Sequence, residues 1–433
     1  MAQMQVVADQ FQPLQLPEPL NVEQTGVRRA FLEDLALKTI YVTAPPSLVE
    51  LADTMRFSYR VVDELFTRLR SEQLAEVTGM RGNAREIALT SMGRARALEL
   101  LALSHYVGAA PVSLDSYIQT VRKQSVSEVN VHMSDVHRAF SDLVLEEDTL
   151  SKIGTALNSG SAIFLYGPTG TGKTAIATRM PRVLANDRVW VPHAVQADGQ
   201  VITVYDPHLH VRVDEPVAND HDGRWVLCRR PSVISGGELT IEMLELQLNP
   251  SSRFYTAPLQ MKANNGVLII DDFGRQRVSP EELLNRWVVP LDRRIDFLTL
   301  AGGRKFEIPF EMFVVFATNL NPTFLGDPAF LRRIQTKIRV GEVSRKRFHQ
   351  IFDRVCEDCG MRSDAGMVDE LIDLIHNRYK EPLRACHPRD MVNQIRWAAR
   401  FENREPRLDR AALQTAVQAY FVSDVDEAAT PAD

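Results

Sequence analysis

Residues 167–174 read GPTGTGKT. This stretch fits the phosphate-binding pattern G-x-x-x-x-G-K-[ST] at every fixed position. The apolar run at 162–166 before it predicts a buried parallel strand, and residues 174–184 after it predict a helix. That order of strand, glycine loop and helix lets loop amides and the positive end of a helix face an anion. We therefore expect a nucleotide-phosphate site here.

Individual residues of the loop have expected roles. The three glycines let the backbone approach a phosphate closely, Lys173 lies against the β- and γ-phosphates of ATP, and the Thr174 hydroxyl ligates Mg²⁺. The expected cofactor-binding residues are Gly167, Pro168, Thr169, Gly170, Thr171, Gly172, Lys173 and Thr174.

Length and composition limit the number of domains and the class of protein. The chain has 433 residues, enough for two or three domains, and is 45% hydrophobic and 24% charged. A net charge of −6 gives no global indication of nucleic-acid or anionic-membrane binding. No run of about 18 apolar residues predicts a membrane span. The first 20 residues lack the features of a secretory signal, and four cysteines suit a reducing compartment, so we expect a cytoplasmic protein.

Two groups of residues could suggest a metal site. Cys356 and Cys359 form a C-x-x-C without a second pair at zinc-ribbon spacing, since only Cys386 follows. We favour structural cysteines over a metal or redox site. His208, His210 and His221 lie in one long segment, where polar loop histidines are the simpler reading.

The pattern along the chain divides it into segments. Gln- and Pro-rich stretches suggest a flexible tail at the start, and strand blocks alternating with helices suggest a parallel sheet covered on both faces in the middle. The expected segments are a tail at 1–27, a small domain at 28–105, a linker at 106–130, an α/β domain at 131–343, a helical lid at 344–420 and a tail at 421–433.

Residues 28–105 have a pattern of their own. Helices are expected at 31–41, 46–56 and 59–71, strands at 74–78 and 86–89, and a closing helix from about Thr90. Three helices, a hairpin and a last helix resemble a winged helix-turn-helix.

Two acidic residues follow an apolar strand block in GVLIIDDF, residues 266–273. Ligands of open α/β sheets bind at the carboxyl ends of strands. We expect Asp271 to hold Mg²⁺, through water, and Asp272 to polarise an attacking water. A surface turn after a buried strand is the alternative.

Three further motifs follow in order. FVVFATN, 313–319, ends in Asn319, which could orient water at a γ-phosphate or simply cap a turn. DPAFLRRI, 327–334, holds Arg332 and Arg333, which could stabilise transition-state charge on a neighbouring subunit's nucleotide or end a solvated helix. HPRD, 387–390, holds Arg389, which could close over the γ-phosphate or be a surface charge at a helix start.

Together, GPTGTGKT, IIDDF, ATN, FLRR and HPRD resemble the AAA+ ATPases over residues 131–420. The resemblance implies Walker A at 167–174, Walker B at 267–272, sensor 1 at Asn319, arginine-finger candidates at Arg332 and Arg333, and sensor 2 at Arg389. It also implies a ring, usually a hexamer, with Mg²⁺ and ATP between subunits. The family's usual Walker B ends Asp-Glu, whereas this chain has the shorter Asp272, which puts the rate of hydrolysis in question.

A hairpin expected around Gly302 and Gly303, before the ATN strand, resembles the branch that includes MoxR proteins, magnesium chelatase and σ54 activators. The GAFTGA loop of a σ54 activator is missing from the sequence, which argues against that role. The long stretch 186–258 is expected to carry extra strands or an insertion toward the ring pore.

Two hypotheses remain for the process that ATP hydrolysis drives. In the first, the ring remodels a protein client, and residues 28–105 bind an adaptor or the client. In the second, residues 59–71 and 79–85 read DNA, with a basic bias from Arg60, Arg68, Arg70, Arg81, Arg85, Arg94 and Arg96. Several acidic residues dilute that bias, and a DNA reader usually has a denser basic face, so we favour the protein client.

Overall fold

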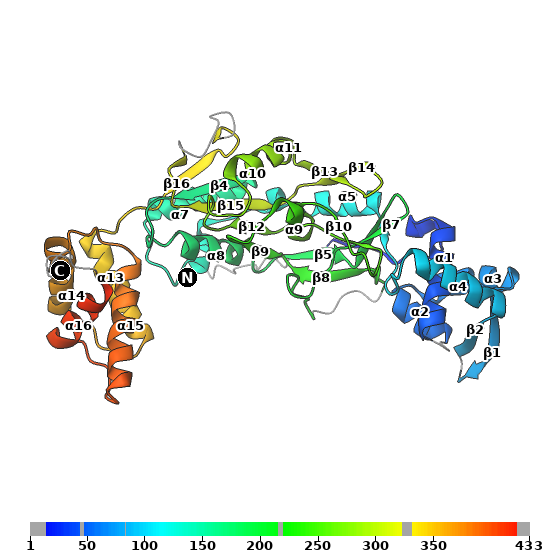
Figure 1. Cartoon of the computed structure of the whole chain (residues 1–433), viewed down its shortest axis with the longest axis horizontal. Helices are drawn as coiled ribbons and strands as arrows, with labels where there is room; N and C mark the ends of the chain where they lie inside the picture. The colour runs from blue at the N-terminus through cyan, green and yellow to red at the C-terminus, as the bar shows by residue number, and fades with distance from the viewer. Residues whose placement is uncertain (1–13, 44–46, 83, 215–219, 323–330, 422–433) are drawn as a thin grey trace, which may run out of the picture.

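The computed structural model describes residues 14–43, 47–82, 84–214, 220–322 and 331–421. The chain is elongated. Figure 1 shows a helical N-terminal part at one end (blue), two sheets in the middle, and the C-terminal helices at the other end (orange to red).

The N-terminal part contains the elements expected at 28–105. They are α1 (Arg29–Thr43), α2 (Leu48–Met55), α3 (Tyr59–Ser71), β1 (Ala75–Arg81), β2 (Ala84–Leu89) and α4 (Ser91–Leu103). β1 and β2 pair antiparallel as a hairpin. Ser47 and Glu50 form a capping box that starts α2, and Thr90 caps α4. The arrangement agrees with the expected order, and its assignment as a winged helix stays a prediction.

The expectation of a loose tail at 1–27 is wrong for its described part, 14–27. Val22 and Val27 are buried in the core of the N-terminal part. The backbone of this segment is also tied down, because Trp190 Nε1 donates to the Leu14 carbonyl at 2.6 Å and the Asp222 amide donates to the Leu16 carbonyl at 2.8 Å. Burial of apolar side chains against distant strands orders this Pro-rich segment. Residues 1–13 lie outside the described residues.

The central sheet has five parallel strands in the order β16-β4-β15-β12-β9. These are β16 (Thr336–Arg339), β4 (Ala162–Tyr166), β15 (Phe313–Thr318), β12 (Val267–Ile270) and β9 (Ser232–Ser235). Because side chains alternate along a strand, Val267 and Ile269 point into one core while Leu268 and Ile270 point into another. Both faces are therefore covered, and the chain has the α/β fold expected from its apolar strand blocks.

Helices cover each face of this sheet. On one side lie α6 (Met133–Ala139), α7 (Glu147–Ser159) and α8 (Lys173–Val183). On the other lie α9 (Leu259–Ala263), α10 (Pro280–Arg286) and α11 (Val288–Arg293).

A second sheet of five strands has the order β10-β11-β7-β6-β3. Its strands are β10 (Gln247–Leu248), β11 (Tyr255–Thr256), β7 (Gln200–Thr203), β6 (Ala194–Ala197) and β3 (Val112–Ser113), and beside it β5 (Arg188–Pro192) pairs with β8 (Trp225–Arg229). Most of these strands come from 186–258, so the extra strands expected there are present.

The segment 106–130 is more than the linker expected. It carries β3, α5 (Leu114–Lys123) and the 3-10 turn η2 (Val126–Glu128). Tyr117 and Val121 of α5 are buried in the core of the second sheet. The run of apolar residues at helical spacing in this segment is short. It forms a stable helix because its apolar side chains pack against the second sheet.

The expected hairpin before sensor 1 is present as β13 (Ile295–Thr299) and β14 (Lys305–Pro309), which pair antiparallel. Among the histidines singled out from the sequence, His210 is buried, with Nδ1 accepting from the Asp206 amide at 2.8 Å and Nε2 2.8 Å from the Lys262 carbonyl. Both ring nitrogens are thus engaged with backbone, so His210 has a structural role.

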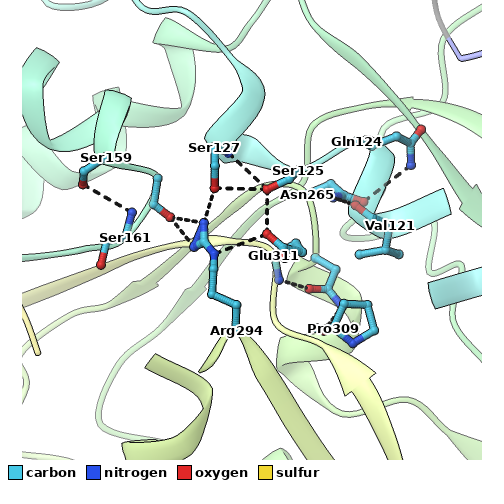
Figure 2. A network of polar contacts seen from close by, with 12 residues as sticks. Val121, Gln124, Ser125, Ser127, Ser159, Ser161, Asn265, Arg294, Pro309 and Glu311 are labelled. Carbon is cyan, nitrogen blue, oxygen red and sulfur yellow. Dashed lines mark hydrogen bonds and ion pairs between the residues drawn. The ribbon is translucent and has the colours of Figure 1, made fainter. Parts of the chain in front are cut away.

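A polar network braces the amino edge of the central sheet (Figure 2). Arg294 donates to the Gly160 carbonyl just before β4, at 2.6 and 2.7 Å, and contacts Ser127. It also pairs with Glu311, which precedes β15 and accepts from Ser125 at 2.6 Å. The strands are therefore held together at the edge opposite the one that ligands of such sheets use.

The C-terminal part is helical, as expected. It comprises α13 (Arg345–Asp358), α14 (Ala365–Asp373), the π-helical turn η5 (Leu374–Arg378), α15 (Cys386–Phe401) and α16 (Arg410–Tyr420). Phe348, Phe352 and Cys356 recur at helical spacing on α13 and are buried. Burial raises the pKa of the Cys356 thiol to about 11, so this cysteine is part of the core. Residues 422–433, in the second expected tail, lie outside the described residues.

Candidate phosphate-binding site

The glycine loop lies at the carboxyl end of β4 and leads directly into α8. Gly167 has φ 144°, and a Cβ added there would lie 2.1 Å from the Val340 carbonyl oxygen, so only glycine fits. Gly172, with φ 99°, is the N-cap of α8 and supplies no side-chain cap. The first amides of α8 therefore lack a side-chain acceptor and face outward as a site for an anion.

Lys173, the first residue of α8, is 7% exposed. Its Nζ donates to the carbonyls of Gly167 at 2.9 Å and Pro168 at 2.6 Å. Burial lowers the pKa of Lys173, and the nearby Asp272 and Asp271 carboxylates partly oppose that shift. The loop thus holds the ammonium group in place beside the two acids that follow the strand β12 (Val267–Ile270).

Thr174 and Asp271 come together although 97 positions separate them. The Thr174 hydroxyl donates to Asp271 Oδ1 at 3.0 Å. Asp271 follows the buried strand β12, and its amide donates to the Ser235 carbonyl at 2.8 Å, which fixes its position. A hydroxyl and a carboxylate are oxygen donors of the kind that Mg²⁺ prefers, so this pair fits the metal expected from the sequence.

Asp272 adopts a left-handed backbone conformation, with φ 49°. Asp and Asn are enriched among the non-glycine residues found there. The next residue anchors this turn: Phe273 is buried against Phe164 and Phe316, and its amide donates to the Ala317 carbonyl at 2.7 Å. The carboxylate that would act on water therefore stands on a fixed backbone.

Asn319 follows β15 at the same edge of the sheet. The buried Thr318 beside it donates its hydroxyl to the Phe273 carbonyl at 2.6 Å, so it ties the ends of β15 and β12 together. Thr318 therefore has a structural role, whereas Asn319 lines a cavity in front of the glycine loop.

A cavity of about 550 Å³ opens in front of the glycine loop and α8. Of the residues expected from the sequence, it is lined by Thr169, Gly170, Gly172, Lys173, Thr174, Asp272, Asn319 and Arg389. The other expected loop residues support this lining. The carbonyls of Gly167 and Pro168 accept hydrogen bonds from Lys173, and Thr171 donates its hydroxyl to the Pro168 carbonyl at 2.9 Å. We refer to this space as the phosphate-side cavity.

A second cavity of about 460 Å³ adjoins it and shares Gly172, Ala175, Arg179 and Arg389. Its walls are residues 142–146, residues 339–343 and α13 of the lid. Arg347 of α13 pairs with Glu146 at 2.6 Å across it. Several wall residues are apolar, among them Leu143, Ile176, Val340 and Ile351. We call this space the base-side cavity.

The lid reaches the glycine loop through the start of α15. The Cys386 amide donates to the Gly170 carbonyl at 3.0 Å. His387 is buried, and burial lowers its pKa to about 4. Arg389, in the first turn of α15, is largely exposed and lines both cavities. The sequence motif HPRD therefore brings an arginine from α15 to both cavities.

Arg332 and Arg333 do not line either cavity of their own chain. Arg332 is exposed, and Arg333 forms an ion pair with Asp292 of α11 at 2.7 Å. The expected role of these arginines at the nucleotide of a neighbouring subunit therefore stays a prediction. The preceding residues 327–330 of the same motif lie outside the described residues.

Sequence reasoning missed four polar residues of the phosphate-side cavity: Thr178, Arg179, Arg275 and Cys386. Thr178 lies four positions after Thr174, and Arg179 lies four positions after Ala175, so the periodicity of α8 could have indicated them. Arg179 also donates to Asp142 at 3.0 Å. Burial raises the pKa of Asp142, but hydrogen bonds from Arg179 and Arg182 outweigh it and leave that pKa below its ordinary value.

Comparisons with known proteins add limited context. A family model described as a domain of unknown function, DUF8689, matches residues 344–419, which carry the C-terminal helices. A search of curated proteins finds no match. Within the described ranges, no helix is long and apolar enough to cross a membrane.

Solved structures that resemble the chain do so at low identity. The RuvB Holliday junction branch migration motor of Thermotoga maritima is 12% identical, with a TM-score of 0.38 over 66% of this chain and 74% of that one. NtrX of Brucella abortus is 13% identical, with a TM-score of 0.41 over 68% of this chain and 60% of that one. At such scores the functional assignment depends on the geometry of the site itself.

Proposed function

We propose that the chain is an AAA+ ATPase that binds and hydrolyses Mg²⁺-ATP. One observation carries the proposal: Thr174 and Asp271 meet at 3.0 Å beside a cavity that Lys173, Asp272, Asn319 and Arg389 also line. Four separate sequence motifs thus converge on one space next to an uncapped helix N-terminus, which suits a polyphosphate.

The residues divide the chemistry among them. The loop amides and Lys173 bind phosphate oxygens, and the base-side cavity receives the adenine. Thr174 and Asp271 would hold Mg²⁺, which would neutralise charge on the phosphates. An Asp272 carboxylate oxygen accepts a proton from the attacking water, and the Asn319 amide orients that water. Arg389 brings positive charge from the lid.

The assembly that we propose is a ring, with ATP at subunit interfaces. Arg332 and Arg333 line neither cavity of their own chain, which supports a finger that acts on the adjoining subunit. The hairpin β13–β14 supports placement near the MoxR and magnesium-chelatase branch.

The output that we propose is remodelling of a protein client rather than reading of DNA. Four of the seven arginines that could give residues 28–105 a DNA-binding face are in ion pairs inside that part, namely Arg68, Arg81, Arg85 and Arg96. Their charge is therefore locally balanced, which weakens attraction to phosphates.

The same part also exposes apolar side chains suited to protein contact. They are Val42, Val49, Tyr59, Met80, Met92, Leu98 and Leu103, which are 41–72% exposed. Titration of the full chain with duplex DNA over a salt series discriminates the two outputs. Binding that falls steeply with salt would favour the DNA alternative, and no binding at low salt supports the protein client.

The nucleotide site itself is tested with Lys173→Ala. We expect calorimetry to show Mg²⁺-ATP binding by the wild-type chain and none by the variant, with hydrolysis abolished. Lys152→Ala is the matched control, because Lys152 is an exposed residue of α7 that pairs with Asp148 and lines neither cavity. Turnover retained by Lys173→Ala would refute the site.

A further inference from the structure

The positive charges around the phosphate-side cavity differ in how far the protein itself neutralises them. The basic residues of its lining are Lys173, Arg179, Arg275 and Arg389. Arg179 is paired with Asp142, Lys173 is held by two loop carbonyls, and Arg389 lies 3.5 Å from Asp390. Within the described ranges, the Arg275 guanidinium has neither a hydrogen bond nor an ion pair, and its residue is exposed.

Although its side chain is unpaired, the backbone of Arg275 is fixed. Its amide donates to the Asp272 carbonyl at 2.9 Å. Gln276 closes the same turn, because its side chain accepts from the Gly274 amide at 2.7 Å and donates to the Asp271 carbonyl at 2.8 Å. A solvated surface arginine needs no such support, whereas a phosphate ligand benefits from a fixed root.

The two cavities give Arg275 a position along the bound nucleotide. Arg275, Asp272 and Asn319 line the phosphate-side cavity and are missing from the base-side lining, whereas Arg389 and Gly172 belong to both. Arg275 therefore belongs to the part of the phosphate-side lining that the base-side cavity does not share, together with the proposed base Asp272. In a nucleoside triphosphate whose base occupies the other cavity, the terminal phosphate is the group that would lie beside Asp272 and Arg275.

We propose that Arg275 binds the terminal phosphate of the triphosphate from within the same subunit and so discriminates ATP from ADP. This inference rests on the proposed ATPase function. A guanidinium matches a phosphate with paired, charge-assisted hydrogen bonds, and ADP carries no group at that position. Arg275 is a cation supplied by the Walker B turn, distinct from the arginines of the lid and of the neighbouring subunit.

The experiment compares Arg275→Ala and Arg275→Lys with Arg277→Ala. Arg277 is an exposed arginine two positions away that lines neither cavity, so it controls for the loss of charge. Affinities for a non-hydrolysable ATP analogue and for ADP are measured by calorimetry with Mg²⁺. We expect Arg275→Ala to weaken analogue binding about tenfold or more, the scale of a charge-assisted hydrogen bond, with ADP affinity within about threefold of wild type. Arg275→Lys should recover part of the loss, and Arg277→Ala should bind both nucleotides like wild type.

Equal losses for the analogue and ADP would overturn the proposal, as would an effect of the same size in Arg277→Ala. Unchanged affinities combined with lost oligomerisation, seen by size-exclusion chromatography, would also overturn it, because Arg275 would then contact an adjoining subunit instead. The wild-type titration distinguishes failure of the ATPase proposal from failure of the proposal for Arg275. No nucleotide binding by the wild-type chain would refute the ATPase proposal, whereas normal binding by Arg275→Ala would refute only the role of Arg275.

Discussion

Replacing Arg224 with alanine should destabilise the junction between the N-terminal part and the second sheet. Arg224 and Asp222 form an ion pair at 2.8 Å, with side chains only 3% and 7% exposed. Arg224 Nη1 also donates to the carbonyls of Thr25 at 3.0 Å and Pro111 at 3.2 Å, and the guanidinium lies over the Phe57 ring. One side chain therefore joins the segment before α1, the region before β3 and the start of β8.

The size of the effect follows from what truncation leaves behind. Removing one partner of a buried ion pair costs about 3–5 kcal/mol, because the remaining charge stays desolvated. Each carbonyl that loses its donor adds up to about 1–3 kcal/mol if water does not enter. Whole domains are stable by only about 5–15 kcal/mol, so we expect a loss of at least about 3 kcal/mol in the free energy of unfolding of this region.

Urea unfolding monitored by tryptophan fluorescence measures this loss. Trp225 directly follows Arg224 and is buried, so it reports on the junction. Arg212→Ala is the control, because its ion pair with Asp214 is exposed and long, at 3.8 Å, and should contribute less than about 1 kcal/mol. The double variant Asp222→Ala with Arg224→Ala should be more stable than Arg224→Ala alone. A loss below about 1 kcal/mol in Arg224→Ala would refute the reasoning, since the pair would then be hydrated.

Three other predictions concern the site and the N-terminal part. Asp272→Asn should keep ATP binding but lower hydrolysis by about 10²–10⁴-fold in a steady-state assay, and near-normal turnover would remove Asp272 as the base. Arg332→Ala or Arg333→Ala should weaken hydrolysis more than binding, and mixing with Lys173→Ala protein should restore part of the activity; rescue in no mixture would argue against a finger in trans. Burial lowers the pKa of Lys38 to about 8, below its unfolded value of 10.5, so the unfolded chain binds the proton more tightly and stability should rise between these two pH values. Lys38→Met should flatten that rise and raise the urea midpoint at pH 7; equal pH slopes in both proteins would contradict this.

Sequence patterns predicted those parts of the fold that depend on local signals. The glycine loop, α8, the strand before Asp271 and the hairpin β13–β14 are each encoded in a short stretch, through periodicity or turn residues. The lid helices follow the same rule, since Phe348 and Phe352 are spaced by one helical turn.

The rest depends on contacts between distant segments. Val22 and Tyr117 lie in stretches that look like a tail and a linker. Val22 becomes buried in the core of the N-terminal part, and Tyr117 becomes buried in the core of the second sheet. The lining of the phosphate-side cavity also depends on distant segments. Arg275 belongs to no motif in the sequence, and it lines the cavity because the turns after β12 and β15 and the start of α15 surround the same space.

The contact between Cys386 and Gly170 has a consequence for how this protein can diverge. Donor and acceptor are both main-chain atoms, so no substitution except proline at 386 removes the donor. At the other end Gly170 is restricted, because its φ is 75° and an added Cβ would lie 2.6 Å from the Cys386 Sγ. Residue identity can therefore change at position 386 without removing the donor that links the C-terminal helices to the loop. A main-chain contact of this kind constrains the sequence at the glycine alone, so relatives that keep this glycine can share the contact whatever side chain follows Ala385.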